Sequence, residues 1–293
     1  MKKYIVVTGG AGFVGSNIIK RLTKISDYKI ISIDNYSTGK IRNHVKHKNV
    51  KYIKSDTIKI AKILKSKCSY IKSIFHFGEF SRIYQSFLNY NQCFNSNILG
   101  TNSVINFCLK NNIKLIYSAT SASLGKRQNK NLSPYAFSKS KNLELLENLK
   151  NWFNFKYEAI YFYNVYGKNQ ISKGNMATII GIFEEQYKKK IPLTVVKPGT
   201  QTRKFTHIND TIDICIEAWM KNEGRHYSIS AKEIYSVLEI AKMFGGKIKY
   251  LPKRSGERYS SALTRMNLSN KVINRIGKSS IKNYISEFKK SLE

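Results

Sequence analysis

The stretch VTGGAGFVGSN (residues 7–17) decides the fold that we expect for this chain. It begins at the end of a short apolar run and leads into a helical pattern that extends from Phe13 to Lys24. Gly9 permits a tight turn, Gly12 lets backbone amides approach a pyrophosphate, and Gly15 allows the helix to pack closely against a sheet. The first turn of such a helix attracts phosphate charge. The stretch therefore predicts a strand–turn–helix unit that binds a dinucleotide.

The second predicted strand narrows the choice of dinucleotide. The run KIISID (29–34) ends at Asp34, nineteen residues beyond Gly15. A carboxylate at this distance accepts hydrogen bonds from both ribose hydroxyls, and it repels a 2′-phosphate. The sequence therefore predicts NAD, rather than NADP, as the cofactor. Asp56 ends the third strand, and two interpretations stay open for it: an adenine contact or an ordinary strand-end residue.

Short apolar runs alternate with helical patterns through the first half of the chain, which is typical of a parallel sheet. We expect an α/β fold of the Rossmann type, a doubly wound parallel sheet with a smaller C-terminal lobe for the substrate. Residues 1–167, with returning segments near 200–225, form the predicted NAD-binding domain, and residues 168–293 mainly form the lobe. The expected strands are 3–9, 29–34, 50–56, 73–78, 114–121, 157–167 and 191–196, and the expected helices are 13–24, 90–111, 134–151, 209–221 and 233–244.

The chain is strongly basic, with 51 Lys and Arg against 18 Asp and Glu and a net charge of +33. Such an excess can indicate a nucleic acid, an anionic membrane or an acidic substrate. It can also reflect AT-biased codons that place lysine at neutral surface positions. The lysines are spread along the chain without a basic tail, which favours the second interpretation.

The remaining composition indicates a soluble protein of the cytoplasm. The four cysteines have neither C-x-x-C nor His-paired spacing, so we expect reduced thiols and no metal site. The apolar run near the N-terminus ends after four or five residues, too soon for a signal peptide. We see no run of roughly 18 to 20 apolar residues, the length of a membrane span.

A candidate catalytic group follows the strand KLIYSATS (114–121). Ligands of open α/β sheets bind outside the carboxyl ends of the strands, where Thr120 is expected. Tyr135 comes fifteen residues later in SPYAFSKSK (133–141), with Lys139 four positions beyond it. Residues i and i+4 share one face of a helix, so Lys139 can place its ammonium near the Tyr135 hydroxyl and the cofactor ribose. A Tyr-x-x-x-Lys pair is common by chance, and its meaning depends on the rest of the chain.

Several motifs in the same order give that context. The chain resembles an extended short-chain dehydrogenase/reductase of the NAD-dependent epimerase/dehydratase family, and within it is most similar to UDP-glucose 4-epimerase-like enzymes. The resemblance covers essentially the whole chain and rests on TGGAGFVGS, DNYSTGK (34–40), FHFGEFSRIYQS (75–86), NSNILGTNSV (95–104), YSATSASLG (117–125), SPYAFSKSK, YFYNVYG (161–167) and GTQTRKFTHINDT (199–211).

The resemblance implies a role for each residue at a matching position. Tyr135 would be the base that removes a proton from a sugar hydroxyl, with Thr120 and Lys139 as its catalytic partners. The implied NAD-binding residues, besides Tyr135 and Lys139, are Gly9, Gly12, Phe13, Val14, Gly15, Asp34, Asn35, Ser37, Asp56, Thr57, Phe77 and Gly78. The implied substrate-binding residues are Glu79, Ser81, Thr120, Asn164, Arg203 and Arg254. The two arginines are expected to clamp a diphosphate, for which a planar guanidinium is well suited.

Departures from the family pattern leave the sugar and the reaction open. The usual H-L-A-A reads His76-Phe77-Gly78-Glu79, which places Glu79 near the nicotinamide or the sugar, and Ser81 stands where a lysine is frequent. The 4,6-dehydratases need a Thr-Asp-Glu series, because the elimination of water requires an extra acid and base. This chain has Thr120-Ser121-Ala122 instead, which disfavours that reaction.

We therefore expect an NAD-dependent epimerase of a nucleotide sugar, with a UDP-hexose 4-epimerase as the leading hypothesis and a transient 4-keto intermediate. One alternative is a nucleotide-sugar 4-dehydrogenase or an epimerase of another position, in which Glu79 would serve as an extra acid or base. The alternative from another class is a non-catalytic NAD-binding protein that binds RNA or other polyanions. The resemblance also implies a homodimer through the helices at 90–111 and 134–151, whereas a membrane partner is not expected.

Overall fold

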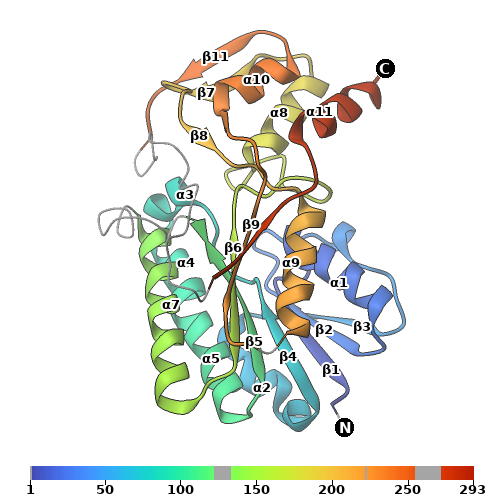
Figure 1. The fold of residues 1–293 in the computed structure, drawn as a ribbon, viewed down its shortest axis with the longest axis vertical. Coiled ribbons are helices and arrows are strands. Elements are labelled where there is room, and N and C mark those ends of the chain that lie inside the picture. The colour runs from blue at the N-terminus through green and yellow to red at the C-terminus, as the bar shows by residue number, and fades with distance from the viewer. Residues whose placement is uncertain (1, 122–132, 222, 255–271) are drawn as a thin grey trace.

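The fold is organised around a parallel sheet of eight strands (Figure 1). The structure is a computed structural model that describes residues 2–121, 133–221, 223–254 and 272–293. The strands of the sheet are β1 (Tyr4–Thr8), β2 (Lys29–Asp34), β3 (Val50–Lys54), β4 (Ile71–His76), β5 (Lys114–Thr120), β6 (Tyr157–Phe162), β9 (His226–Ser230) and β12 (Val272–Ile276). Their order is β12-β9-β6-β5-β4-β1-β2-β3, and every neighbouring pair runs parallel. This confirms the predicted doubly wound α/β fold.

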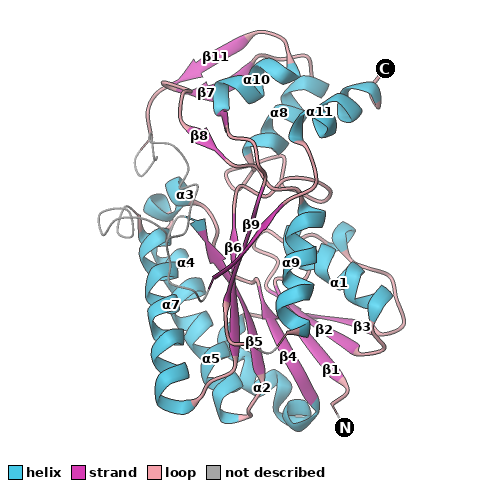
Figure 2. Ribbon diagram, in the orientation of Figure 1, coloured by secondary structure: helices cyan, strands magenta, loops and turns pink. Residues whose placement is uncertain are grey.

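Helices cover both faces of the sheet, because its central strands are apolar on both sides (Figure 2). Along β1, Ile5 and Val7 face one helical layer and Val6 faces the other, as the alternation of a strand requires. The first layer consists of α1 (Phe13–Ile25) and α9 (Ile208–Met220). The second consists of α2 (Ile60–Leu64), α5 (Thr101–Lys110) and α7 (Pro134–Phe153). No helix among the described residues is long and apolar enough to cross a membrane.

The helix expected at 90–111 is present but contains a π-helical segment. It consists of α4 (Tyr90–Phe94), η4 (Asn95–Gly100) and α5, and it follows the short helix α3 (Ile83–Leu88). Asn97 of η4 is fully buried and bonds both backbone groups of Phe80, at 2.7 and 3.0 Å, as well as the Ser138 hydroxyl at 3.1 Å. The π-helical turn thereby joins the loop after β4 to α7. Three 3₁₀ segments, η1 (Ile41–Asn43), η2 (Thr57–Lys59) and η3 (Lys65–Tyr70), connect the other elements of this half.

A smaller lobe lies beyond the carboxyl ends of the large sheet (Figure 1). It contains α8 (Ile179–Lys188), α10 (Val237–Phe244), α11 (Ile281–Lys290) and two strand pairs, the parallel β7 (Leu193–Val196) with β11 (Ile248–Leu251) and the antiparallel β8 (Thr202–Arg203) with β10 (Tyr235–Ser236). Phe183, Phe244 and Phe288 bring its three helices together, with ring centroids 5.8 and 5.9 Å apart.

Two element boundaries in the second half differ from the prediction. The helix expected at 233–244 begins only at Val237, because Ser236 and Glu239 form a capping box at its N-terminus. Tyr235 and Ser236, directly before the helix, pair with β8 as strand β10. The strand expected at 157–167 ends at Phe162. Asn164 and Gly167 have φ angles of 38° and 126°, which a continuous strand does not allow.

The returning part of the chain is larger than the predicted 200–225 segment. Strand β9 pairs with β6, and β12 pairs with β9, so residues 226–230 and 272–276 belong to the large sheet. Both runs lie inside the region that we assigned mainly to the smaller lobe. Neither strand is recognisable from the sequence as a part of the large sheet, because pairing at long range leaves no local signal.

A buried ion pair closes the end of the sheet opposite to the smaller lobe. Lys114 opens β5, and its Nζ lies 3.2 Å from Oε1 of Glu158 on β6, with both side chains at most 9% exposed. The same ammonium donates to the carbonyl groups of Ala218, Trp219 and Lys221 at the end of α9. These contacts hold the C-terminus of α9 against the amino ends of β5 and β6.

Candidate active site

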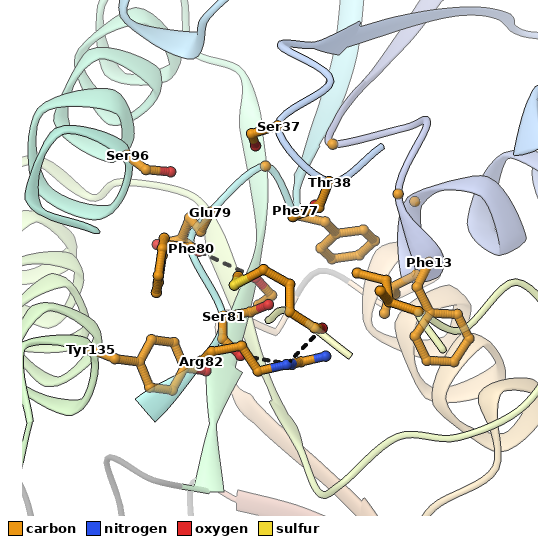
Figure 3. A pocket seen from close by; sticks show the side chains of 18 of the residues that line it. Phe13, Ser37, Thr38, Phe77, Glu79, Phe80, Ser81, Arg82, Ser96 and Tyr135 are labelled. Atoms are coloured by element: carbon orange, nitrogen blue, oxygen red, sulfur yellow. Dashed lines mark hydrogen bonds between the residues drawn. The ribbon is translucent and has the colours of Figure 1, made fainter. Parts of the chain in front are cut away.

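One cleft of about 910 Å³ collects nearly all of the predicted site residues. It lies outside the carboxyl ends of β1 and β4, the neighbouring strands at which the strand order reverses, and this is the usual position of a ligand in an open α/β sheet. The loops after the strands contribute to its lining (Figure 3), and so do Asn164, Met176 and Arg203 from the second half of the chain.

The glycine turn at the cleft has no room for larger residues. Gly9 has a φ of 69°, and a Cβ there would lie 2.8 Å from the Cα of Gly78. A Cβ on Gly15 would lie 2.1 Å from the carbonyl oxygen of Gly9, which explains why the helix can start directly on the turn. Gly12 caps α1 in an extended conformation and faces the cleft. The turn therefore presents backbone amides and a helix N-terminus toward the space that a pyrophosphate would occupy.

Asp34 stands at the end of β2 and lines the same cleft. Its Oδ2 accepts the backbone N–H of Ala11 at 2.9 Å, and its Oδ1 accepts that of Tyr36 at 2.8 Å. Burial raises the pKa of Asp34, and these two backbone bonds oppose the rise. The carboxylate is thus fixed between the glycine turn and the next loop, which fits a ribose contact, and this half of the cleft suits a dinucleotide.

The other predicted cofactor residues also line the cleft. They are Phe13, Val14, Asn35, Ser37, Asp56, Thr57, Phe77 and Gly78. Asp56 has a structural role as well, because its Oδ1 accepts the backbone N–H of Ile58 at 3.0 Å and caps η2. Its Oδ2 accepts the amide of Asn35 at 3.2 Å, which ties the loops after β2 and β3 together. Both interpretations that the sequence left open for Asp56 remain compatible with this placement.

Tyr135 and Lys139 lie in the first two turns of α7, and Thr120 lies at the end of β5. The helix begins at Pro134 because the Ser133 hydroxyl accepts the backbone N–H of Ala136 at 3.1 Å. All three side chains line the cleft. Burial raises the pKa of Tyr135 to about 12, a hydrogen bond with Thr120 opposes the rise, and Glu79 adds to it. The structure therefore brings the predicted catalytic residues together, with Tyr135 in its hydroxyl form.

Lys139 and Glu79 are placed differently from the expectation. The Lys139 ammonium forms an ion pair with Oε2 of Glu79 and also donates to the carbonyl group of Ser118. The two side chains are only 4% and 3% exposed. We expected Lys139 to act on the Tyr135 hydroxyl and Glu79 to reach the sugar. Instead, the two charges are paired with each other. Both side chains line the cleft, so the contact of Glu79 with the sugar stays a prediction.

The predicted substrate residues also line the cleft, with one exception. Ser81, Asn164 and Arg203 line it. The Asn164 amide donates to the carbonyl group of Lys204 at 3.0 Å, which orients the side chain. Arg254 does not belong to the lining formed by the described residues, and its guanidinium lies 5.3 Å from the centroid of the Tyr84 ring on α3. Ala122, the last residue of the series that disfavours a dehydratase, lies outside the described ranges.

Arg82 is a cleft residue that the sequence did not indicate. Its Nε donates to the carbonyl group of Met176 at 2.9 Å, and a terminal nitrogen donates to that of Ser81 at 2.8 Å (Figure 3). Its positive charge lowers the pKa of Tyr135. Arg82 lies in the motif at 75–86, directly after Ser81, and this position is the signal that could have indicated it. Its contact with Met176 leaves no local pattern in the sequence.

The comparison with protein families agrees with this geometry. The model of the NAD dependent epimerase/dehydratase family matches residues 5–230. The chain belongs to this family. Its cofactor is NAD, as the description of the family states.

Individual relatives are similar over most of their length. A protein of Methanocaldococcus jannaschii with the inferred name UDP-glucose 4-epimerase is 28% identical, and the alignment covers 87% of this chain and 88% of that protein. ADP-L-glycero-D-manno-heptose-6-epimerase of Fusobacterium nucleatum is 28% identical over 72% of this chain and 69% of its own. Among solved structures, UDP-N-acetylglucosamine 4-epimerase of Methanobrevibacter ruminantium M1, in complex with UDP-N-acetylmuramic acid, is 25% identical with a TM-score of 0.84 and covers 100% of this chain and 98% of its own.

Proposed function

We propose that the protein is an NAD-dependent epimerase of nucleotide sugars that acts at C4 of a UDP-linked hexose. The observation that carries the proposal is the single cleft in which Thr120, Tyr135 and Lys139 meet the glycine turn and Asp34. Epimerases of UDP-sugars among the relatives support the choice of nucleotide and carbon atom.

The cofactor end of the cleft consists of residues suited to NAD. The amides of the glycine turn and the first turn of α1 would hold the pyrophosphate, and Asp34 would accept the ribose hydroxyls. Bound NAD would supply a reversible acceptor for the hydrogen and electron pair of the sugar carbon. The chain's own residues supply the binding, the orientation and the movement of the proton.

Tyr135 is the proposed acid and base. Its oxygen removes the proton of the sugar hydroxyl as the carbon is oxidised, and it gives the proton back when the 4-keto group is reduced from the opposite face. Thr120 hydrogen-bonds to Tyr135 and can contact the same sugar oxygen. The unligated pKa of about 12 means that positive charge near Tyr135 is needed for its base form.

The substrate end of the cleft offers neutral and cationic groups. Ser81 and Asn164 provide a hydroxyl and an amide, and Arg203 provides a guanidinium for the diphosphate. Arg254, whose guanidinium lies over the Tyr84 ring, stays a proposed diphosphate contact on the basis of the resemblance alone. The division into an NAD-binding domain and a substrate lobe is likewise part of the proposal.

We also propose that the protein is a cytoplasmic homodimer. The helices that the resemblance implies for a dimer, α4–η4–α5 and α7, lie on one side of the molecule (Figure 1). They expose Tyr90, Leu99 and Phe137 to 52%, 46% and 41%. Cys68, Cys93, Cys108 and Cys215 are free thiols, which fits a reducing compartment. Light scattering should give twice the chain mass, and Leu99→Glu should give the monomer; a monomeric wild-type protein would contradict the proposal.

The decisive experiment follows two products at once. Purified protein with NAD is incubated with UDP-, GDP-, CDP- and ADP-sugars, while the absorbance of reduced nicotinamide is recorded and the sugar nucleotides are separated. We expect a new C4 epimer of a UDP-sugar without accumulation of NADH. NADH that rises in step with a keto sugar would make the protein a dehydrogenase instead. No change across the panel would contradict catalysis and direct attention to binding of polyanions.

A further inference from the structure

Glu79 is the centre of a buried polar network that the proposed reaction does not use. Its Oε1 accepts the hydroxyl groups of Thr101 at 3.0 Å and Tyr117 at 3.2 Å, and the amide of Asn142 lies 3.5 Å away. Its Oε2 accepts the ammonium of Lys139. Every one of these neighbours is a donor, so the carboxylate faces them as an acceptor and has no need of a sugar hydroxyl.

The network also fixes the direction of its hydrogen bonds back to the glycine turn. Thr8 receives the backbone N–H groups of Phe77 and Gly78, so its own hydroxyl hydrogen is left for Nδ1 of His76 at 2.7 Å. Nε2 of His76 then carries the hydrogen that faces the Thr101 hydroxyl at 2.9 Å. Thr101 passes its hydrogen to Glu79. The carboxylate is therefore held from β4, α5, β5 and α7 together.

The position of Lys139 follows from this network. The ammonium has Glu79 and the Ser118 carbonyl group as partners, and it lies 4.5 Å from the centroid of the Tyr117 ring. These contacts direct it to the buried side of the cleft. A lysine one turn after Tyr135 would otherwise be free to approach the tyrosine oxygen.

We propose that Glu79 is a positioning residue, which keeps the Lys139 ammonium as its own counter-ion and so holds it away from the Tyr135 oxygen. The inference rests on the proposed role of Tyr135 as the base.

The other titratable groups around the pair do not compete with this explanation. Burial lowers the pKa of His76 to about 4, raises that of Cys93 to about 11, and raises that of Tyr117 well above its usual range. These three side chains therefore stay neutral between about pH 6 and pH 9. The charged side chains that act on the pKa of Tyr135 are then Glu79, which raises it, and Arg82, which lowers it.

The test replaces the charge of Glu79 and keeps its shape. In Glu79→Gln, the negative charge near Tyr135 is lost, so the base form of Tyr135 should appear about 1 pH unit lower than in the wild type. The readout is the near-ultraviolet absorbance of tyrosinate in the cofactor-free protein, taken as the difference between each protein and the same protein with Tyr135→Phe. The acid limb of the pH profile of kcat/KM, which reports the free enzyme, should move in the same direction.

Thr101→Val is the matched control, since it removes one donor to Glu79 and leaves the charge in place. It should lower stability without moving the titration of Tyr135. Equal titrations of the wild type and Glu79→Gln, or an equal shift in Thr101→Val, would overturn the inference. If Glu79→Gln does not fold, Glu79→Ala provides the same comparison. A wild type without turnover would refute the proposed function, whereas the absorbance titration would still decide the role of Glu79.

Discussion

A buried lysine–glutamate pair lies at each end of the strands of the large sheet, and the two pairs differ in their surroundings. Lys114 and Glu158 lie at the amino ends of the strands, and their other hydrogen bonds are to the backbone. Lys114 donates to three carbonyl groups, and Glu158 accepts the N–H groups of Gly224 and Arg225. Lys139 and Glu79, at the carboxyl ends of the strands, border the cleft, and the other partners of the Glu79 carboxylate are side chains. The first pair joins elements of the sheet, and both residues of the second pair line the cleft. Burial alone therefore does not distinguish a structural ion pair from a functional one.

The largest expected effect is a loss of turnover from a change in the cleft, at the carboxyl ends of the strands. Tyr135→Phe removes the group that carries the proton, so turnover should fall by about 10³-fold. The phenyl ring keeps the packing, and the affinity for NAD and the thermal midpoint should stay close to those of the wild type. Turnover comes from the epimerase assay and affinity from calorimetry. Near-normal turnover would refute the assignment of Tyr135 as the base.

A change in the Lys114–Glu158 pair, at the amino ends of the strands, should affect stability instead of turnover. Lys114→Met leaves the carboxylate of Glu158 buried without its partner, which should cost about 3 kcal/mol in the free energy of unfolding. Denaturant titration measures the loss, and turnover at a temperature where the variant is folded should be unchanged. Lys141→Ala, which breaks an exposed pair with Glu144, is the control and should cost less than about 0.5 kcal/mol. Equal losses in the two variants would remove the distinction between buried and exposed pairs.

The polar network around Glu79 includes His76, and its contribution to stability should decrease in acid. Burial lowers the pKa of His76 to about 4, from an ordinary value of 6.5. The folded state binds this proton less tightly than the unfolded chain, so its stabilising contribution is complete above pH 6.5 and is lost as the pH falls toward 4. The loss should approach roughly 3 kcal/mol. Thermal unfolding between these pH values, with His76→Gln as the variant that lacks this titration, checks the slope; parallel curves would contradict it.

The smallest expected effect concerns the cap of the helix that carries Tyr135 and Lys139. Ser133→Ala removes the acceptor of the Ala136 N–H and should cost about 1 kcal/mol in the free energy of unfolding. Ser133→Thr keeps a hydroxyl and should cost clearly less. Denaturant titration of the three proteins measures the order. A loss of turnover without a loss of stability would show that Ser133 acts in the cleft rather than as a cap.

The sequence was sufficient where function depends on local spacing. The glycine turn, Asp34 and the Tyr135–Lys139 pair lie on one strand end or one helix each, so their positions follow from residue intervals. Glu79 could be placed near the cleft, but its pairing with Lys139 depends on how deeply the loop after β4 lies against α5 and α7. Arg82 reaches the cleft through the carbonyl group of Met176, far away in sequence. Contacts of this kind leave no periodic pattern.

The position of β9 and β12 in the large sheet has a consequence for synthesis of the chain. After residue 162 leaves the ribosome, β6 is an open edge, and its partner arrives only with residues 226–230. An unpaired edge is a template for pairing with another chain. The stretch made in between, including α8 and β7, must therefore be produced while the nascent sheet is still open to aggregation, and a chain cut short before residue 226 would keep that edge for good.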